Sequence, residues 1–453
     1  MRTEERLTDW VLRACFEDFP GSTLSTIKNQ FLTIVGTTVA GATEDGCEEA
    51  VQFYRELGGK GEATIFIYGG KVPAHDAAFL NGVMGRALDL CDSMAPGPHI
   101  GAALIPAALA AAELAGGTSG GRFLEAVTVD NEVAARMNLS EQAYDGFDPT
   151  GICVIFGAAA AASRILGLSK QEAWNALALA FNRCAGSFQS HIDGSLGVRF
   201  VQGWVAQGGL LCARLASRGI TGPKNFLEGG YGYLHLYGKS LVTGGQILAG
   251  LGERYDLEKM VYKKYPSCAL TQGPTDAILR LIAEESVSAE DVERIEVTVP
   301  PYAYKLVGHE FETGENPRVN AQFNIRYCVA NALLRGASRL EHFREGQIRD
   351  GGAVELSRRV CVIPDKALER RGHTAMDMRV RTVDGRDFVR QVDVAPGFPG
   401  NPLAREDHEK RFQDCLTFAR RPVSRDSASK IVSMIEEFEQ VEDVRTLIKL
   451  LVT

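Results

Sequence analysis

The stretch 102-AALIPAALAAAELAG-116 is apolar on nearly every side of the helix that its composition predicts. A second stretch of the same kind follows at 154-VIFGAAAAASRILG-167. A helix that is hydrophobic all round is buried among other helices, and its alanine and glycine residues let those neighbours approach closely. These two stretches therefore predict the centre of a helical bundle, and we expect a mostly α fold.

Helical periodicity extends outward from these two stretches over residues 1–265. Residues 24–42 and 72–90 carry apolar side chains at helical spacing, and residues 169–182 and 199–217 do the same. The first 265 residues therefore predict a large, all-helical domain.

The periodicity changes after residue 265. Residues 292-VERIEVTVP-300 alternate as a strand does, and 376-MDMRVRTVDGRDFVRQVDV-394 has two alternating arms. The arms meet at Asp384-Gly385, a dipeptide typical of a type I′ turn. Helices are expected beside them at about 270–285 and 320–336. Residues 266–403 are thus predicted to form a smaller α+β domain.

Two domains suit a chain of 453 residues, which is too long for one ordinary core. Residues 404–453 return to helical periodicity, and we expect them to complete the helical domain. The smaller domain would then act as a lid. Clefts between domains are preferred ligand sites, so candidate residues are expected on helix ends and loops that face such a cleft.

Charge and cysteine usage narrow the classes of function. The net charge of −8 is spread without blocks, which argues against nucleic acid as a partner. None of the ten cysteines forms a C-x-x-C pair, so we expect buried free thiols and no metal centre. The N-terminal MRTEERLTDW has no apolar signal core, and every apolar run can be a soluble core helix. A cytoplasmic protein without a membrane segment is expected.

The segment 88-LDLCDSMAPGPH-99 concentrates polar side chains beside an apolar helix. Asp89 and Asp92 would share a helix face, and Ser93 would lie one turn beyond Asp89. The Pro96-Gly97-Pro98 turn would bring His99 to the start of the next helix, where free N–H groups favour an anion. The segment is interpreted either as helix ends with a surface histidine or as half of an active site.

Two further segments of the predicted helical domain carry candidate groups. In 146-GFDPTG-151, Asp148 precedes a proline, and Thr150 can cap the apolar helix that follows. In 187-SFQSHIDGSLGVRFVQGW-204, His191 is a candidate acid–base group. Arg199 near a helix start opposes the helix dipole, so it is expected to need an anionic partner. The alternative is a capped helix whose arginine extends into solvent.

Two segments of the predicted smaller domain add a cation and a phenol. In 262-YKKYPSCALTQ-272, a lysine such as Lys263 can bind a carboxylate, and in 318-RVNAQFNIRYCVANALL-334 Tyr327 interrupts an apolar helix. No Walker loop, dinucleotide fingerprint or G-x-S-x-G motif occurs. Carboxylates, histidines and cations together suit proton transfer at a carbon next to a carboxylate.

In this order the segments resemble the MmgE/PrpD family over nearly the whole chain. The family's N-G-x(3)-H-x-L-D-F-D-D-T-H and H-P-x-A patterns are similar to 81-NGVMGRALDLCDSMAPGPHIGAALIPAAL-109, and G-F-H-P-T-G is similar to 146–151. K-x-Y-P-x-C-x-x-T-H resembles 263-KKYPSCALTQ-272, and D-V-P-x-G-x-P-x-N-P-L resembles 393-DVAPGFPGNPL-403. The resemblance implies a helical domain, a smaller lid domain, a homodimer and activity without a cofactor.

This chain matches some of the family's active-site residues and differs from others. Asp89 and His99 stand at family active-site positions, Ser93 replaces the usual threonine, and Lys263 matches the family's basic residue. Where the family has histidine, this chain has the following residues: Arg86, Asp148, Val201 and Gln272. Val198 replaces a family lysine. Fewer cations indicate a substrate with fewer carboxylates than a tricarboxylate, or one with a charged amine.

The resemblance implies a lyase or isomerase that removes the proton α to a carboxylate of a small di- or tricarboxylic acid. In this hypothesis Asp89 orients the acid–base group His99, Asp148 or His191 acts from the opposite side, and Tyr327 supplies a proton or a hydrogen bond. The residues expected to bind the substrate are Ser93, Arg199, Lys263 and Gln272. An iminodisuccinate-type epimerase and a catalytically altered ligand-binding paralog are the alternatives.

Overall fold

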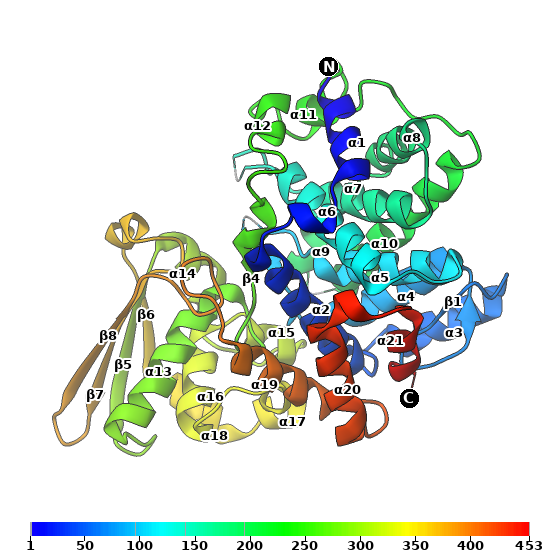
Figure 1. Ribbon diagram of the computed structural model, residues 1–453. Coiled ribbons are helices and arrows are strands. Elements are labelled where there is room, and N and C mark those ends of the chain that lie inside the picture. The colour runs from blue at the N-terminus through cyan, green and yellow to red at the C-terminus, as the bar shows by residue number, and fades with distance from the viewer. Residues whose placement is uncertain (1, 96, 141, 194, 453) are drawn as a thin grey trace. The chain divides into compact units, whose positions relative to one another are not determined.

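The computed structural model describes residues 2–95, 97–140, 142–193 and 195–452. The chain divides into two compact units, each shown in Figure 1. Unit 1 consists of Met1–Met260 with His408–Thr453, and unit 2 consists of Val261–Asp407. The fold is mostly α, as the apolar stretches predicted.

Unit 1 is a bundle of helices with three two-residue strands. Its helices are α1 (Thr3–Arg13), α2 (Gly21–Gly41), α3 (Cys47–Leu57), α4 (Ala74–Arg86), α5 (Gly101–Leu114), α6 (Gly120–Met137), α7 (Pro149–Ile165), α8 (Lys170–Phe181), α9 (Gln189–Ile192), α10 (Gly197–Ala216), α11 (Tyr233–Leu236), α12 (Gly244–Leu248), α20 (Arg425–Glu436) and α21 (Arg445–Leu450). The strands are β1 (Ala63–Thr64), β2 (Lys71–Val72) and β3 (Ser93–Met94). Helix α19 (Arg405–Leu416) and strand β4 (Met260–Val261) cross the unit boundary.

Helix α5 is the centre of this bundle. It packs against α2, α4, α6, α7 and α10. Every residue from Gly101 to Ala112 is buried. Helix α7 is buried from Pro149 to Ser163, so the two apolar stretches occupy the interior that their composition predicted.

Glycines let the inner helices approach closely. A Cβ atom added to Gly157 of α7 would lie 2.4 Å from the main-chain oxygen of Asp130 in α6. A Cβ added to Gly209 of α10 would lie 2.3 Å from the Cβ of Ala158 in α7. Any side chain at either glycine would force the helices apart, because these separations are below van der Waals contact.

The helix predicted for residues 72–90 ends earlier than expected. Helix α4 stops at Arg86, and the N–H of Asp89 donates to the carbonyl of Arg86 at 3.1 Å. Asp89 itself has φ of +53°, a left-handed conformation that aspartate tolerates better than most residues. Asp89 and Asp92 therefore do not share a helix face. Of the predicted turn, Pro96 lies outside the described residues.

The start of α7 also differs from the prediction. Asp148, not Thr150, is the N-cap: its side chain accepts a hydrogen bond of 2.8 Å from the N–H of Thr150. Pro149 occupies the first helical position, where its missing N–H has no consequence. The hydroxyl of Thr150 is not the cap and instead accepts a hydrogen bond from the N–H of His99.

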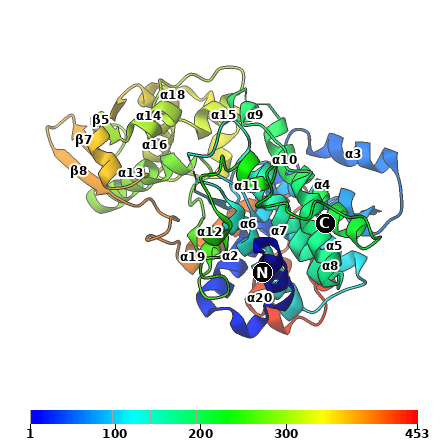
Figure 2. The same ribbon diagram turned by 90° about the horizontal axis from the view of Figure 1, so that it is seen from above.

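Unit 2 combines a four-stranded sheet with helices, as Figure 2 shows from above. Its strands, β5 (Val292–Val299), β6 (Val360–Pro364), β7 (Met376–Thr382) and β8 (Asp387–Val392), lie in the order β6-β5-β7-β8. Its helices are α13 (Gln272–Glu285), α14 (Pro301–Val307), α15 (Pro317–Gln322), α16 (Ile325–Arg335), α17 (Glu345–Ile348) and α18 (Gly351–Ser357). One apolar cluster joins α13 and α16 to β5, β6 and β7.

The predicted hairpin is present, but its turn is of another type. β7 and β8 pair antiparallel, with Arg381 opposite Asp387. Gly385 has φ of +91°, whereas Asp384 is not among the non-glycine residues with positive φ, and a type I′ turn requires positive φ at both. The N–H of Gly385 donates to the carbonyl of Thr382, which indicates a longer loop closed by a glycine bulge.

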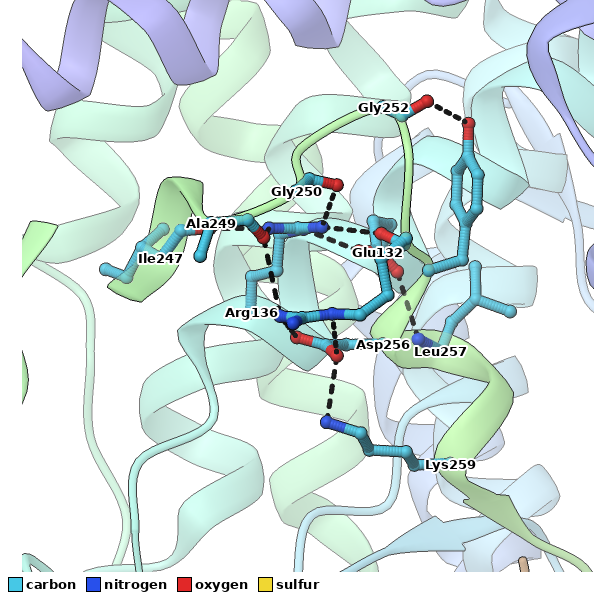
Figure 3. Close-up of polar contacts among 11 residues, drawn as sticks. Glu132, Arg136, Ile247, Ala249, Gly250, Gly252, Asp256, Leu257 and Lys259 are labelled. Carbon is cyan, nitrogen blue, oxygen red and sulfur yellow. Dashed lines mark hydrogen bonds and ion pairs between the residues drawn. The ribbon is translucent and has the colours of Figure 1, made fainter. Parts of the chain in front are cut away.

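A buried arginine anchors the segment that follows α12 (Figure 3). Arg136 of α6 pairs with Glu132 at 2.5 Å. Its guanidinium also donates to four carbonyl oxygens, those of Ile247, Ala249, Gly250 and Arg254. The other oxygen of Glu132 accepts from the N–H of Leu257. These bonds fix the 247–257 segment on the side of α6.

Within the described part of the chain, no helix is both long and apolar enough to cross a bilayer.

Candidate active site

The carboxylate of Asp89 lies between an arginine and a histidine. Its Oδ1 atom is 2.6 Å from Nη1 of Arg86 and 3.9 Å from Nε2 of His99. All three side chains are largely buried, with 4%, 13% and 12% of their surfaces exposed for Arg86, Asp89 and His99. The left-handed turn at Asp89 folds the chain back so that its side chain reaches both groups.

His99 is held by its backbone and by one ring nitrogen. Its Nδ1 lies 2.9 Å from the carbonyl oxygen of Asp92 and 3.3 Å from Sγ of Cys91. Its N–H donates to Oγ1 of Thr150 at 3.0 Å. A carbonyl oxygen can only accept, so Nδ1 carries a proton and Nε2 is the nitrogen that can take one up.

Asp92 has a structural role. Its carboxylate accepts from the N–H of Gly101 at 2.9 Å and from the amide of Gln30 at 3.1 Å. Burial raises the pKa of Asp92, although these donors oppose the shift. A Cβ at Gly101 would lie 2.7 Å from Oδ1 of Asp92, so glycine is needed where the carboxylate meets the start of α5.

Asp148 lies next to this cluster, at the start of α7. It is 2% exposed, and burial raises its pKa even though the N–H of Thr150 and the charge of Arg86 lower it. A carboxyl group whose pKa is raised keeps its proton to higher pH and can act as an acid. Thr150 connects Asp148 to His99 through one bond to each residue.

The sequence did not identify two residues of this cluster. Arg86 is 3% exposed and was noted only as a departure from the family pattern. In the sequence, the sign of a role for Arg86 was a single cation inside the apolar helix 74–86, three residues before Asp89. Gln202 of α10 is 1% exposed, and its Nε2 is 3.5 Å from Oγ1 of Thr150. Its signal in the sequence was its place among the polar residues of 187–204, although it was not predicted to belong to the site.

Arg199 and His191 lie on the elements that follow α8. Nη1 of Arg199 donates to the carbonyl oxygen of Asp45 at 2.6 Å. Burial lowers the pKa of Arg199, and the neighbouring charge of Arg86 lowers it further while Cys47 opposes the shift. His191 in α9 stacks on Phe188 with ring centroids 4.3 Å apart. Arg199 is thus close to Arg86, whereas His191 has an aromatic partner.

Ser93 lies in β3 and is half-buried. It follows Asp92 directly, on the segment that holds the ring of His99. Because α4 ends at Arg86, Ser93 and Asp89 do not share the helix turn that the sequence predicted.

The remaining predicted residues belong to unit 2. Lys263 is buried, with 3% of its surface exposed. The amide of Gln272 is bonded to the turn before it: Oε1 accepts from the N–H of Tyr265, and Nε2 donates to the carbonyl of Tyr265. Tyr327 is fully buried, and its hydroxyl donates to the carbonyl of His342 at 2.8 Å. Gln272 and Tyr327 thus have structural partners inside unit 2.

Among the residues that the structure describes, no group of three or more His, Cys, Asp or Glu side chains is arranged to hold a metal ion.

Two family models match the chain. The MmgE/PrpD N-terminal domain matches residues 5–242, and the MmgE/PrpD C-terminal domain matches residues 265–437. The first match alone covers more than half of the chain. The second match begins at residue 265, where the periodicity of the sequence changes.

Several characterised proteins are similar over most of their length. Human cis-aconitate decarboxylase is 26% identical over 441 residues, covering 94% of this chain and 89% of the human protein. The mouse protein of the same name is 26% identical over 84% of this chain and 79% of its own length. Cis-aconitate decarboxylase of Aspergillus terreus is 23% identical over 98% of this chain and 94% of its own.

Proposed function

The chain belongs to the MmgE/PrpD family, and on this basis we propose that it is a lyase that acts on a small di- or tricarboxylic acid. Relatives named as decarboxylases match nearly its whole length, which supports chemistry of the dehydratase or decarboxylase type. The proposal rests on two groups that lie in one cluster: His99, whose Nε2 faces Asp89, and the buried acid Asp148.

The two groups suit the proton transfers of such a reaction. In a dehydration, Nε2 of His99 removes the proton α to a carboxylate, and the proton of Asp148 leaves with the hydroxyl group as water. In a decarboxylation, the bond to the carboxylate breaks, its electron pair stays on the adjacent carbon, and Asp148 protonates that carbon. The cations Arg199 and Lys263 are each proposed to bind a carboxylate, as the sequence predicted.

A screen of di- and tricarboxylates by NMR in deuterated water tests the proposal. Dehydration, decarboxylation and solvent exchange each give a distinct spectrum, so one experiment reports all of them. We expect turnover of at least one acid, and a loss of about 100-fold or more in His99→Ala. Full activity of His99→Ala, or of Lys263→Ala toward its substrate, would contradict these assignments.

An epimerase is the second candidate. Epimerisation needs two acid–base groups on opposite faces of one carbon, and His99 and Asp148 reach the cluster from different elements, bridged by Thr150. Deuterium incorporation at the α carbon without elimination would support it. Release of water or carbon dioxide would count against it.

A paralog that binds its ligand without turnover is the third candidate. It is motivated by Val198 and Val201 on α10, where the family has a lysine and a histidine. Val201 is buried, and a Cβ added to Gly186 would lie 3.9 Å from Cγ1 of Val201 and 3.1 Å from Cβ of Asp148. Thermal stabilisation by an acid that no assay consumes would favour this candidate, and any turnover would exclude it.

We further propose a homodimer, as the family resemblance implies. Helices α3 and α10 expose large apolar side chains: Phe53, Leu57 and Trp204 are 55%, 62% and 52% exposed. Exposed apolar patches of this kind mark interaction surfaces. Light scattering is expected to give twice the chain mass, and Trp204→Glu to shift it toward the monomer. A cytoplasmic location is also proposed, since all ten cysteines are free thiols.

A further inference from the structure

We infer that Arg86 is a positioning residue, which draws Asp89 to itself and so limits how strongly that carboxylate pairs with His99. Both neighbours approach the same oxygen, Oδ1 of Asp89, but at different distances. Arg86 lies at hydrogen-bonding distance, 2.6 Å, whereas Nε2 of His99 lies at 3.9 Å. The carboxylate of Asp89 therefore interacts mainly with Arg86. The positive charge of Arg86 compensates much of the negative charge that acts on the imidazole of His99.

The contacts of Arg86 differ from those of a framework arginine. Arg136 donates to four carbonyl oxygens and to Glu132, so it ties a whole segment together. Among the described residues, Asp89 is the one ion-pair partner of Arg86, and the buried Nε of Arg86 has no hydrogen-bond acceptor. A buried donor without a partner is costly, so a purely structural role explains Arg86 poorly.

The effect on His99 follows from its fixed tautomer. Nδ1 carries a proton because it faces the carbonyl oxygen of Asp92, so any change of charge occurs at Nε2, beside Asp89. An uncompensated carboxylate at this position favours the imidazolium. A carboxylate neutralised by Arg86 leaves the imidazole neutral and able to accept a proton. Arg86 thereby sets the pH range in which His99 is a base.

The charged and titratable groups around His99 come from several elements. Arg86 is the last residue of α4, Asp89 lies in the turn after it, and Cys91 and Asp92 contact the ring. Asp148 is one bridge away through Thr150. The charge of Arg199 from α10 acts on Arg86. Removing Arg86 also removes a direct repulsion of the imidazolium, so the test has to separate that direct effect from the effect through Asp89.

Histidine NMR in the full-length protein makes this test without a substrate. The chain has eight histidines, and His99 is assigned by loss of its signal in a His99→Gln variant. We expect the Nδ1–H tautomer in the unsubstituted protein. In Arg86→Gln we expect the titration midpoint of His99 to rise by about one pH unit, since the full charge of Asp89 then acts at about 4 Å. Arg86→Lys, which keeps the charge, should restore most of the original midpoint.

A double-mutant cycle with Asp89→Asn separates the two effects. If Arg86 acts through Asp89, the upward shift caused by Arg86→Gln becomes much smaller in the Asp89→Asn background. A shift of equal size in both backgrounds would overturn the inference. Arg164→Gln, which removes a cation paired with Glu125 elsewhere in unit 1, is the matched control and should leave the His99 midpoint unchanged.

This inference rests on the proposed function for its catalytic meaning, but the two can fail separately. An Nε2–H tautomer in the unsubstituted protein would overturn the inference without any substitution of Arg86, even if Arg86→Gln failed to fold. Full activity of His99→Ala would instead remove the proposed function and leave the titration result standing. Where a substrate is found, the acidic limb of kcat/KM against pH should move upward in Arg86→Gln together with the NMR midpoint.

Discussion

Replacing Asp148 by asparagine and by alanine separates the two roles of this side chain. As a cap, Asp148 accepts a hydrogen bond of 2.8 Å from the N–H of Thr150 at the start of α7. As a buried carboxyl group, it is an acid whose pKa burial raises. Asparagine keeps the acceptor and the approximate shape but has no titratable proton. Alanine removes both.

The magnitudes follow from these contacts. Losing an aspartate cap costs about 1 kcal/mol, whereas asparagine caps as well as aspartate does. Because the N–H of Thr150 stays buried without an acceptor in Asp148→Ala, we expect the upper end of the range for a lost cap, about 2 kcal/mol. We therefore expect Asp148→Ala to be less stable than Asp148→Asn by about this amount. Asp148→Asn should stay close to the unsubstituted protein at acidic pH.

The pH dependence has a definite sign. A carboxyl group whose pKa is raised on folding contributes stability that is present below its unfolded pKa and is lost as pH rises through its folded pKa. Asp148→Asn lacks this group, so its stability relative to the unsubstituted protein should increase with pH. Each unit by which folding raises the pKa corresponds to about 1.4 kcal/mol of this difference.

Urea unfolding at a series of pH values measures both effects. Asp365→Asn is the matched control, since Asp365 makes the same 2.8 Å bond to the N–H two residues on but is exposed in unit 2. The control should show no growing difference with pH. If the stability of Asp148→Asn relative to the unsubstituted protein is independent of pH, or falls as pH rises, Asp148 is not a proton-holding acid. Its assignment as the proton donor would then fail as well.

Three other substitutions test the packing of unit 1. Asp130 is fully buried with a pKa raised well above its ordinary value by burial, so Asp130→Asn should gain stability over the unsubstituted protein as pH rises, as urea unfolding would show. Arg136→Met leaves the partner carboxylate buried without its cation and should cost about 3–5 kcal/mol in the same assay. Gly120→Ala would place a Cβ 1.6 Å from the carbonyl oxygen of Phe438 and should lower Tm by several degrees, whereas Gly121→Ala, whose Cβ would meet nothing closer than 3.8 Å, should not.

The interior of unit 1 was predictable because it depends on composition and period alone. A stretch such as 102–116 is apolar in every direction, so its burial needs no knowledge of its neighbours. The ends of the elements were less predictable, because they depend on single contacts. Helix α4 ends at Arg86, before the end of its apolar pattern, because Asp89 takes a left-handed conformation and turns the chain.

In the candidate site, too, local contacts were predictable from the sequence and contacts between distant segments were not. Asp89 and His99 are close in sequence, so their proximity was a local prediction. The links to Thr150 and Gln202 join three separate elements, and no local pattern indicates them. Tyr327 interrupts an apolar helix, which predicted a functional position, but its hydroxyl meets a carbonyl inside unit 2.

Arg86 and Asp148 show why a substitution is best interpreted together with its neighbours. Taken singly, Asp148 in place of a family histidine suggests a lost acid–base group, because an ordinary carboxyl group is ionised at neutral pH. Burial raises its pKa, and the positive charge of Arg86 opposes that shift, while the charge of Asp148 in turn raises the pKa of Arg86. The two departures from the family pattern are therefore electrostatically coupled. A return to histidine at one position alone is therefore expected to change the ionisation of the other.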